Sequence, residues 1–438
     1  VMAFMAIIET LFCAKLVTAI PRFYTDAIDE KGRGAVISTA FAVTGLMSAA
    51  SVIAVVAASV PLSQLLFATP LHSLVVSLCG VQILTQALEY YGLLYFRLLE
   101  RPYSYLSISV AKLIAQVALN VYLVVHLELG VLGVAASGFA SSAVFAIGLT
   151  VWSLRKAGVF IDLSLARRLW AFSWPLWLAG LASLYIGTSS RYFMRAFHSL
   201  DSVGIFELAS KFGGVLTLLV IGPVVQHWQT EQFSVVRGAD SEMRLRLMIL
   251  IIGSVLLVGA AGISVMAAPV IHIMAAPAFW SATNAVPFLV LAAVAAAIAS
   301  LTSAKFLAAD ETAFLTTSRY GAAVIATVAY LGLIPLLGHV GAAAGIAVTE
   351  VCYLGWIAWS VRRRHGITLP LVGLLGPAII CAALVAAFWS VNVASIAVDI
   401  ALRAFATLLA AGAVLALLMR NKEAKGTLLD LYRSRVAS

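Results

Sequence analysis

Apolar runs of about 20 residues, separated by short polar connections, recur from one end of the chain to the other. A helix of this length crosses the ~30 Å hydrocarbon core of a bilayer, where the backbone must satisfy its own hydrogen bonds. We therefore predict an all-α polytopic membrane protein, with no connection long or polar enough to hold a second soluble domain. The predicted spans are 1–20, 35–59, 72–95, 104–126, 131–152, 169–190, 203–226, 247–268, 283–304, 315–336, 341–361, 369–390 and 395–419.

The pattern also repeats at an offset of 208 residues. Gly-Val-Leu-Gly-Val-Ala-Ala at 130–136 lines up with Gly-His-Val-Gly-Ala-Ala-Ala at 338–344, and Arg-Lys-Ala-Gly at 155–158 lines up with Arg-Arg-His-Gly at 363–366. Two similar halves within a helical membrane protein are typical of transporters. The repeat predicts two pseudo-symmetric helical bundles, at 1–158 and 159–366, then an extra transmembrane helix pair over 367–419 and a basic tail at 420–438.

The offset also predicts that the chain lacks its first transmembrane helix. Helix 203–226 maps onto a segment that begins just before residue 1, and helix 169–190 maps onto a segment for which the chain has no residues. By this correspondence, one N-terminal helix and its lead-in, roughly 40 residues, are missing.

The charged residues indicate an orientation. The chain is 63% hydrophobic and only 11% charged, with a net charge of +9. Alternate connections, together with the tail, hold 22 of the 28 Lys and Arg residues, and the intervening connections hold none. By the positive-inside rule, the basic connections and the C-terminus are cytoplasmic. The positive charge therefore reflects topology and anionic lipid head groups, and no nucleic-acid partner is expected.

A further set of charges falls within the predicted spans or at their ends. A charge at the centre of a membrane helix costs about 2.5–3.5 kcal/mol, so each should face the protein interior or a water-filled cavity. The cations are Lys15, Lys112, Arg191, Arg195, Lys211 and Arg403, and the acids are Glu9, Glu89, Glu207, Glu350 and Asp399.

Two of these acids stand four residues before a cation. Glu207 with Lys211, and Asp399 with Arg403, could form ion pairs along one helix face. For Lys211 and Arg403, a structural ion pair and an anion-binding role both stay open.

The other cations have no acid three or four residues away on their own helix. Lys15 and Lys112 either line a cavity or pair with Glu9 or Glu89 of another helix. Arg191 either faces an anionic substrate or is held by an acid.

Two further residues have alternative roles. Arg195 could extend its side chain to the outer surface. Glu350, in the middle of a span, either carries a coupling proton or is buried with its bonds satisfied.

Enzyme motifs are missing. The chain has no Walker P-loop, no His-Glu-x-x-His motif and no Asp-rich catalytic loop, and its four cysteines show no paired spacing. We expect a protein that is not an enzyme and that uses no cofactor and no metal.

Several segments resemble the Wzx-type polysaccharide flippases of the multidrug/oligosaccharidyl-lipid/polysaccharide (MOP) superfamily. Ser-Ser-Arg-Tyr-Phe at 189–193, followed by Val-Gly-Ile-Phe-Glu-Leu-Ala-Ser-Lys at 203–211, is similar to the family's "DRY…vGiYslAyK" stretch. Trp-Gln-Thr-Glu-Gln-Phe at 228–233 and Arg-Phe-Tyr at 22–24 are similar to two further family segments. Ser190 stands where the family commonly has Asp, and Glu207 could supply that missing negative charge.

The resemblance implies transport of a polyprenyl-diphosphate-linked oligosaccharide across the bacterial cytoplasmic membrane for surface polysaccharide synthesis. It implies a MATE-like fold whose two lobes rock about a cavity, with polysaccharide polymerase and glycosyltransferases as partners. In this scheme Lys15 and Lys112 receive the diphosphate from inside, and Arg191, Lys211 and Arg403 hold it nearer the outside. Glu89, Glu207, Glu350 and Asp399 are candidates for counter-charges or coupling groups, and the last helix pair could line a groove for the polyprenyl tail.

Two other function classes remain open. A cation-coupled antiporter of the same fold would favour an acidic cavity, whereas the spans hold six cations and five acids. A membrane assembly partner without transport activity would need neither the repeat nor the charges inside the membrane.

Overall fold

The computed structural model describes residues 16–67, 69–237, 241–389, 391 and 395–420. All regular elements within these ranges are helices, as the hydrophobic pattern predicts. The chain divides into two compact units, one ending at Leu184 and the other starting at Tyr185, so that helix α8 (Leu163–Phe197) runs through both.

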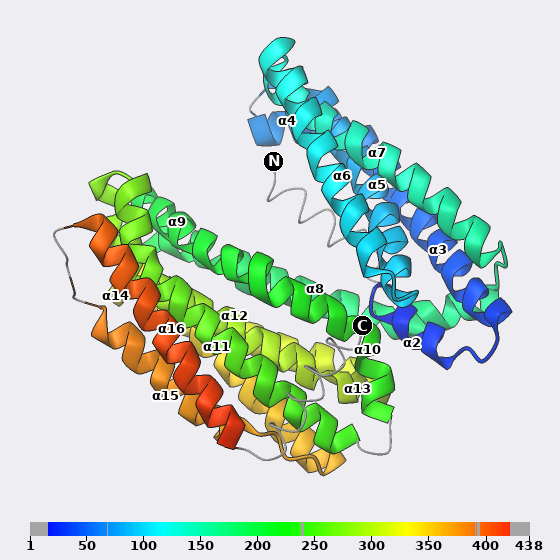
Figure 1. Ribbon diagram of the computed structural model, residues 1–438. Coiled ribbons are helices and arrows are strands. Elements are labelled where there is room, and N and C mark those ends of the chain that lie inside the picture. The colour runs from blue at the N-terminus through cyan, green and yellow to red at the C-terminus, as the bar shows by residue number, and fades with distance from the viewer. Residues whose placement is uncertain (1–15, 68, 238–240, 390, 392–394, 421–438) are drawn as a thin grey trace. The chain divides into compact units, whose positions relative to one another are not determined.

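The first unit is a helical bundle in which α5 and α7 pack closely against each other and α3 packs against both (Figure 1). The polypeptide between α7 and α8 is held on α3, because the Ser38 hydroxyl donates to the carbonyl of Phe160 at 2.7 Å. Asp162 caps α8, because its carboxylate accepts hydrogen bonds from the amides of Ser164 and Leu165. These hydrogen bonds, and above all the one from the Ser164 side chain, lower the pKa of Asp162.

The elements of the first unit are α2 (Ala19–Asp26), α3 (Glu30–Ala57), α4 (Ser59–Phe67), η1 (Pro70–His72), α5 (Ser73–Leu98), α6 (Pro102–Val121), the π-helix η2 (Tyr122–His126), α7 (Gly130–Ala157) and the first part of α8 (Leu163–Phe197).

In the second unit, α12 is the most buried of the long helices and packs against α9, α11 and α14. Helices α15 and α16 pack against α11. Its other elements are α9 (Leu200–Leu216), the π-helix η3 (Thr217–Ile221), α10 (Gly222–Arg237), α11 (Ser241–Met274), η4 (Pro277–Asn284), α12 (Val286–Thr302), α13 (Ala304–Ala308), α14 (Thr312–His365), α15 (Leu371–Ala387) and α16 (Ile396–Arg420).

Helix α14 consists of two arms that fold back on each other. Its backbone leaves the helical conformation at Gly338, where φ is +57°. A Cβ atom at Gly341 would lie 2.1 Å from the carbonyl oxygen of Leu333, so only glycine allows this close approach of the arms. The two predicted spans 315–336 and 341–361 are therefore the two arms of α14.

Each of the twelve predicted spans from residue 35 onward contains helix, and ten helices in the described ranges are long and apolar enough to cross a membrane. Most of the predicted span 1–20, with Lys15 and Glu9, lies outside the described residues, as does the predicted tail beyond Arg420.

The backbone carries the repeat. Glycines with positive φ stand at the start and end of corresponding segments, Gly130 (+52°) with Gly338 (+57°) and Gly158 (+79°) with Gly366 (+71°), each 208 residues apart. The turns before α6 and α14 also correspond, since Glu100 and Asp310 both have positive φ, but these two residues are 210 positions apart. Two extra residues therefore lie between Glu100 and Gly130, the stretch that holds the π-helix η2.

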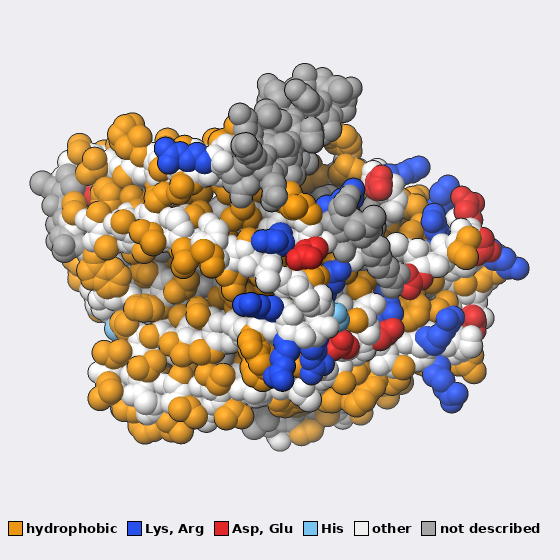
Figure 2. Space-filling model, turned by 90° about the horizontal axis from the view of Figure 1, so that it is seen from below, with side chains coloured by type: hydrophobic (Ala, Val, Ile, Leu, Met, Phe, Trp, Pro, Cys, Tyr) orange, Lys and Arg blue, Asp and Glu red, His pale blue; other side chains and the backbone are white. Residues whose placement is uncertain are grey.

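The surface suits a lipid environment. Leu218, Val324 and Leu408 are among many large apolar side chains that are more than 60% exposed. Figure 2 shows one face on which Lys, Arg, Asp and Glu side chains gather over part of the surface while wide areas are hydrophobic. A soluble monomer rarely exposes apolar patches of this extent, so the surface supports a multi-pass membrane protein.

Candidate functional site

A row of charges lies on α8 and α9 of the second unit. Arg191 of α8 forms an ion pair with Glu207 of α9, and it also donates to the carbonyl of Gly187 one turn earlier. Its guanidinium carbon lies 5.6 Å from the centre of the Phe206 ring. Glu207 therefore provides the counter-charge for Arg191 on the neighbouring helix and not for Lys211 on its own helix.

This pairing leaves Lys211 without an ion-pair partner among the described residues. Lys211 stands one turn beyond Glu207 on α9 and its side chain is exposed. Arg195, one turn beyond Arg191, is exposed as well. Three cations and two acids, Asp201 and Glu207, thus stand on this part of α8 and α9, and we name Arg191, Arg195, Glu207 and Lys211 the α8–α9 charge row.

Glu350 has a partner that the sequence reasoning missed. Arg319 of the first arm of α14 donates two hydrogen bonds, of 2.7 and 2.8 Å, to the carboxylate of Glu350 on the second arm. The side chains are only 14% and 6% exposed, and Arg319 also lies 4.8 Å over the Tyr353 ring. Arg319 lies inside the predicted span 315–336, and this position was the signal in the sequence that it could pair within the membrane.

The first unit contains an ion pair between α5 and α6. Lys112 lies 2.7 Å from Glu89, which confirms one of the two roles predicted for Lys112. The other carboxylate oxygen of Glu89 is buried without a hydrogen-bond partner in the described part of the chain. Gln116 and Asn120 follow Lys112 at intervals of four residues, so a polar stripe runs along α6 from this pair.

Arg403 is held within the protein. It pairs with Asp399 at 2.7 Å and donates to the carbonyls of Val265 and Val391 at 2.8 and 2.9 Å. Pro269, four residues after Val265 in α11, has no amide hydrogen to offer that carbonyl. Arg403 therefore satisfies a carbonyl that a proline leaves free, which ties α16 to α11.

Two neighbouring cavities lie beside these helices in the second unit. One, of about 440 Å³, is lined almost wholly by apolar side chains of α11, α12 and α15. The other, of about 170 Å³, is more polar and is bordered by His272, Asn284 and Arg403. Both share Ser264 and Trp389 among their lining residues, so the apolar cavity adjoins the polar one. Of the final helix pair, α15 lines the apolar cavity and α16 borders the polar one.

The sequence-predicted charges thus fall into separate places. The described structure joins Lys112 with Glu89, Arg191 with Glu207, and Arg403 with Asp399, and it leaves Lys211 exposed. Lys15 lies outside the described residues.

Comparison with known proteins shows the fold. No family model matches the sequence, and no curated protein matches it. Among solved structures, the chain is similar to the lipid II flippase MurJ in an inward closed conformation, with a TM-score of 0.67 and 12% identity over 96% of this chain and 92% of that chain. It is also similar to an outward-facing MATE multidrug resistance transporter of the MOP superfamily, with a TM-score of 0.67 and 15% identity over 87% of this chain and 86% of that chain. A MOP superfamily transporter from Pyrococcus furiosus, described as having a binding pocket of reverse polarity, gives a TM-score of 0.67 and 14% identity over 89% of this chain and 87% of that one.

These similarities confirm the predicted fold class. The chain is a multi-pass, all-helical membrane protein with the fold of the MOP-superfamily transporters and of the lipid flippase. At such low identity the comparison supports the fold alone, so the substrate has to be argued from the chain's own residues.

Proposed function

We propose that the chain is a flippase that moves a polyprenyl-diphosphate-linked oligosaccharide across the bacterial cytoplasmic membrane by alternating access. The observation that carries the proposal is the α8–α9 charge row, in which Glu207 pairs with Arg191 and leaves Arg195 and Lys211 without an ion-pair partner in the described part of the chain. A net positive charge on membrane-spanning helices is costly unless it serves an anion, and a diphosphate is strongly anionic. In this proposal Lys211 holds the diphosphate directly, because no acid of the described chain neutralises it.

The apolar cavity supports the lipid part of this substrate. A polyprenyl chain is purely hydrocarbon and gains free energy wherever it leaves water for an apolar surface. The cavity among α11, α12 and α15 offers such a surface next to the polar cavity that is bordered by His272 and Asn284. The flippase MurJ aligns with 96% of this chain, whereas the MATE structures align with 83 to 89%.

Glu89 and Lys112 would take a different part in the cycle. Glu89 pairs with Lys112 through one carboxylate oxygen, and its other carboxylate oxygen is buried without a hydrogen-bond partner in the described part of the chain. We propose this pair as the coupling group of the first unit. Glu350 and Asp399 serve as counter-charges to Arg319 and Arg403.

A complementation experiment tests the function in cells. The cells lack their own polysaccharide flippase gene, and surface polysaccharide and resistance to cationic dyes are both measured. We expect the chain to restore surface polysaccharide, and the variant Lys112→Ala with Arg191→Ala to restore much less. Dye resistance without polysaccharide would contradict the proposal and favour a small-molecule antiporter.

A further inference from the structure

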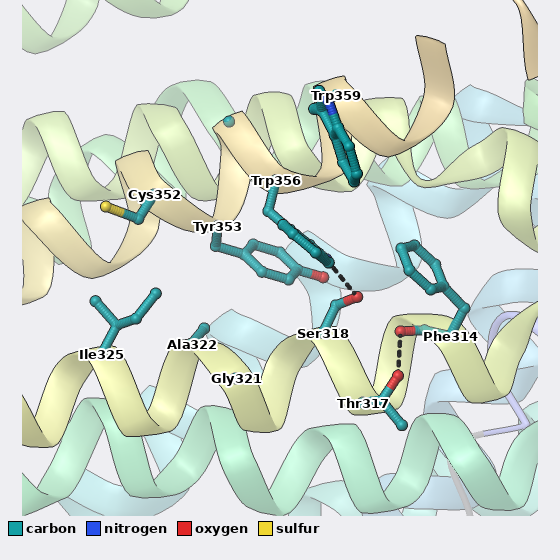
Figure 3. Close-up of a pocket in the computed structure, with 11 residues that line it drawn as sticks. Phe314, Thr317, Ser318, Gly321, Ala322, Ile325, Cys352, Tyr353, Trp356 and Trp359 are labelled. Atoms are coloured by element: carbon teal, nitrogen blue, oxygen red, sulfur yellow. Dashed lines mark hydrogen bonds between the residues drawn. The ribbon is translucent and has the colours of Figure 1, made fainter. Parts of the chain in front are cut away.

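A cleft lies between the two arms of α14, apart from the cavities described above, and its lining residue Tyr353 carries the ring that Arg319 covers. It has a volume of about 630 Å³ and its lining is almost entirely apolar. Figure 3 shows Tyr353, Trp356 and Trp359 on the second arm directed towards Phe314, Ser318 and Ala322 on the first arm. All its walls belong to the second unit, so the cleft is a property of α14 itself.

The lining of this cleft differs from the matching residues of the first unit. In the segment that keeps the 208-residue offset, Cys352, Gly355 and Trp359 correspond to Val144, Ile147 and Val151 of α7. The counterparts in α7 are ordinary aliphatic side chains, and Val144 and Ile147 are 69% and 66% exposed. The second unit thus has Cys352 and Gly355 where the first unit has Val and Ile, and it has Trp356 and Trp359 where the first unit has Gly148 and Val151. A difference of this kind between matched helices points to a function that one unit alone performs.

The lining provides an apolar surface with few polar groups. Trp356 and Trp359 are about half exposed, with ring centres 5.2 Å apart, and the indole N–H of Trp356 donates to the Ser318 hydroxyl at 3.1 Å. Because the indole hydrogen is already used within the protein, the rings present their hydrocarbon surface to whatever fills the cleft.

Positive charge stands at one end of the cleft. The guanidinium carbon of Arg363 lies 5.2 Å from the Trp359 ring, and that of Arg364 lies 4.1 Å from the Phe314 ring. Arg364 also pairs with Glu311 at 2.7 Å, whereas Arg362 and Arg363 have no ion-pair partner among the described residues. The loop charges predict that this end faces the cytoplasm. Arg362 and Arg363 both stand in the last turn of α14, next to this end of the cleft. An apolar cleft beside two such cations complements an amphiphile with a hydrocarbon chain and a doubly charged anionic head.

We propose that the α14 cleft binds the isoprenoid chain of a polyprenyl diphosphate, with the diphosphate held by Arg362 and Arg363 at the cytoplasmic end. The proposal rests on the proposed function in choosing this lipid, and it adds a docking site at which the substrate is taken up from the inner leaflet. An ordinary phospholipid has the same general chemistry but carries a single phosphate, so the two cations favour the diphosphate.

A cleft-filling variant tests the site without damage to the fold. Gly355→Ile introduces the residue found at the matching position of α7, and the Cβ atom at Gly355 would meet no atom within 4 Å. The matched control is Gly332→Ile on the other arm, where a Cβ atom also meets nothing within 4 Å but the position lies outside the cleft. Both changes replace a glycine, which weakens a helix, so neither should lower the stability of the folded protein.

The readout is photo-crosslinking of the full chain in nanodiscs by a polyprenyl diphosphate with a diazirine in its isoprenoid chain. We expect the label on peptides from both arms of α14, a loss of roughly tenfold with Gly355→Ile, and no change with Gly332→Ile. Unlabelled polyprenyl diphosphate should compete, whereas phosphatidylglycerol and inorganic pyrophosphate should compete poorly.

Four outcomes would overturn the proposal: no label on the two arms of α14, equal labelling of the two variants, equal competition by phosphatidylglycerol, or crosslinks between two copies of the chain through α14. The measurement needs no transport. Labelling in the cleft without lipid movement would therefore contradict the proposed function but not the docking site. Lipid movement without this label would contradict the docking site but not the proposed function.

Discussion

Replacing Glu350 by Ala is expected to lower the free energy of unfolding by about 3–5 kcal/mol, because the change leaves the buried Arg319 charge without its partner. Both side chains are mostly buried and the carboxylate accepts two short hydrogen bonds. The pair also joins the two arms of α14, so its loss should loosen the hairpin itself. Unfolding of the purified protein in mixed micelles, followed by circular dichroism, measures the change.

The control is the exposed pair of Arg364 and Glu311, with side chains 49% and 30% exposed. Its variant Glu311→Ala should cost only about 0–1 kcal/mol, since water solvates the remaining arginine. Replacing both Arg319 and Glu350 by Met should recover most of the loss, because no charge is then left buried. If Glu350→Ala costs no more than Glu311→Ala, the two arms are not joined by this pair.

Reversing the charge at Lys211 is expected to reduce lipid transport by roughly 10- to 100-fold, the effect of losing ~1.5–3 kcal/mol from one hydrogen bond to a charged group. Lys211→Glu would also place a second acid beside Glu207, which repels a diphosphate. The side chain is exposed and has no ion-pair partner in the described part of the chain, so the fold should be unaffected. Initial transport rates in proteoliposomes at matched protein density measure the change.

Two further variants separate charge from packing. Lys211→Arg keeps the charge and should keep most of the activity, whereas Lys156→Ala removes an exposed lysine from the last turn of α7 and should change little. Equal rates for Lys211→Glu and Lys156→Ala would remove Lys211 from the proposed anion path.

Hydrophobic pattern alone predicted the fold class and the helices. Runs of about 20 apolar residues leave few options in a bilayer, so the spans from residue 35 onward each contain helix. The repeat was also visible in the sequence, since Gly130 and Gly338, like Gly158 and Gly366, are the residues that adopt positive φ. The shift to a 210-residue offset before α6 was not visible, because a π-helical turn and its loop absorb the two residues without changing the apolar pattern.

Partner choice among the charges could be predicted only where the partners share one helix. The four-residue spacing of Asp399 and Arg403 correctly indicated their pair, but the same spacing failed for Glu207 and Lys211. There Arg191 of the neighbouring helix takes the acid, and a single sequence does not show which helix faces are adjacent. Arg319 and Glu350 are 31 residues apart for the same reason. The α14 cleft depends on small residues such as Gly355 and Cys352, whose effect appears only once the arms are packed.

The central claim is transport of a polyprenyl-diphosphate-linked oligosaccharide, and the most direct measurement is its movement in proteoliposomes that contain only the purified chain. The fluorescent lipid-linked oligosaccharide is placed in one leaflet, and its appearance in the other is followed with a membrane-impermeant quencher. We predict movement well above that of protein-free liposomes, and movement close to the protein-free level with Lys211→Glu. Movement no faster than in protein-free liposomes, together with uptake of a cationic dye by the same vesicles, would contradict the proposed function.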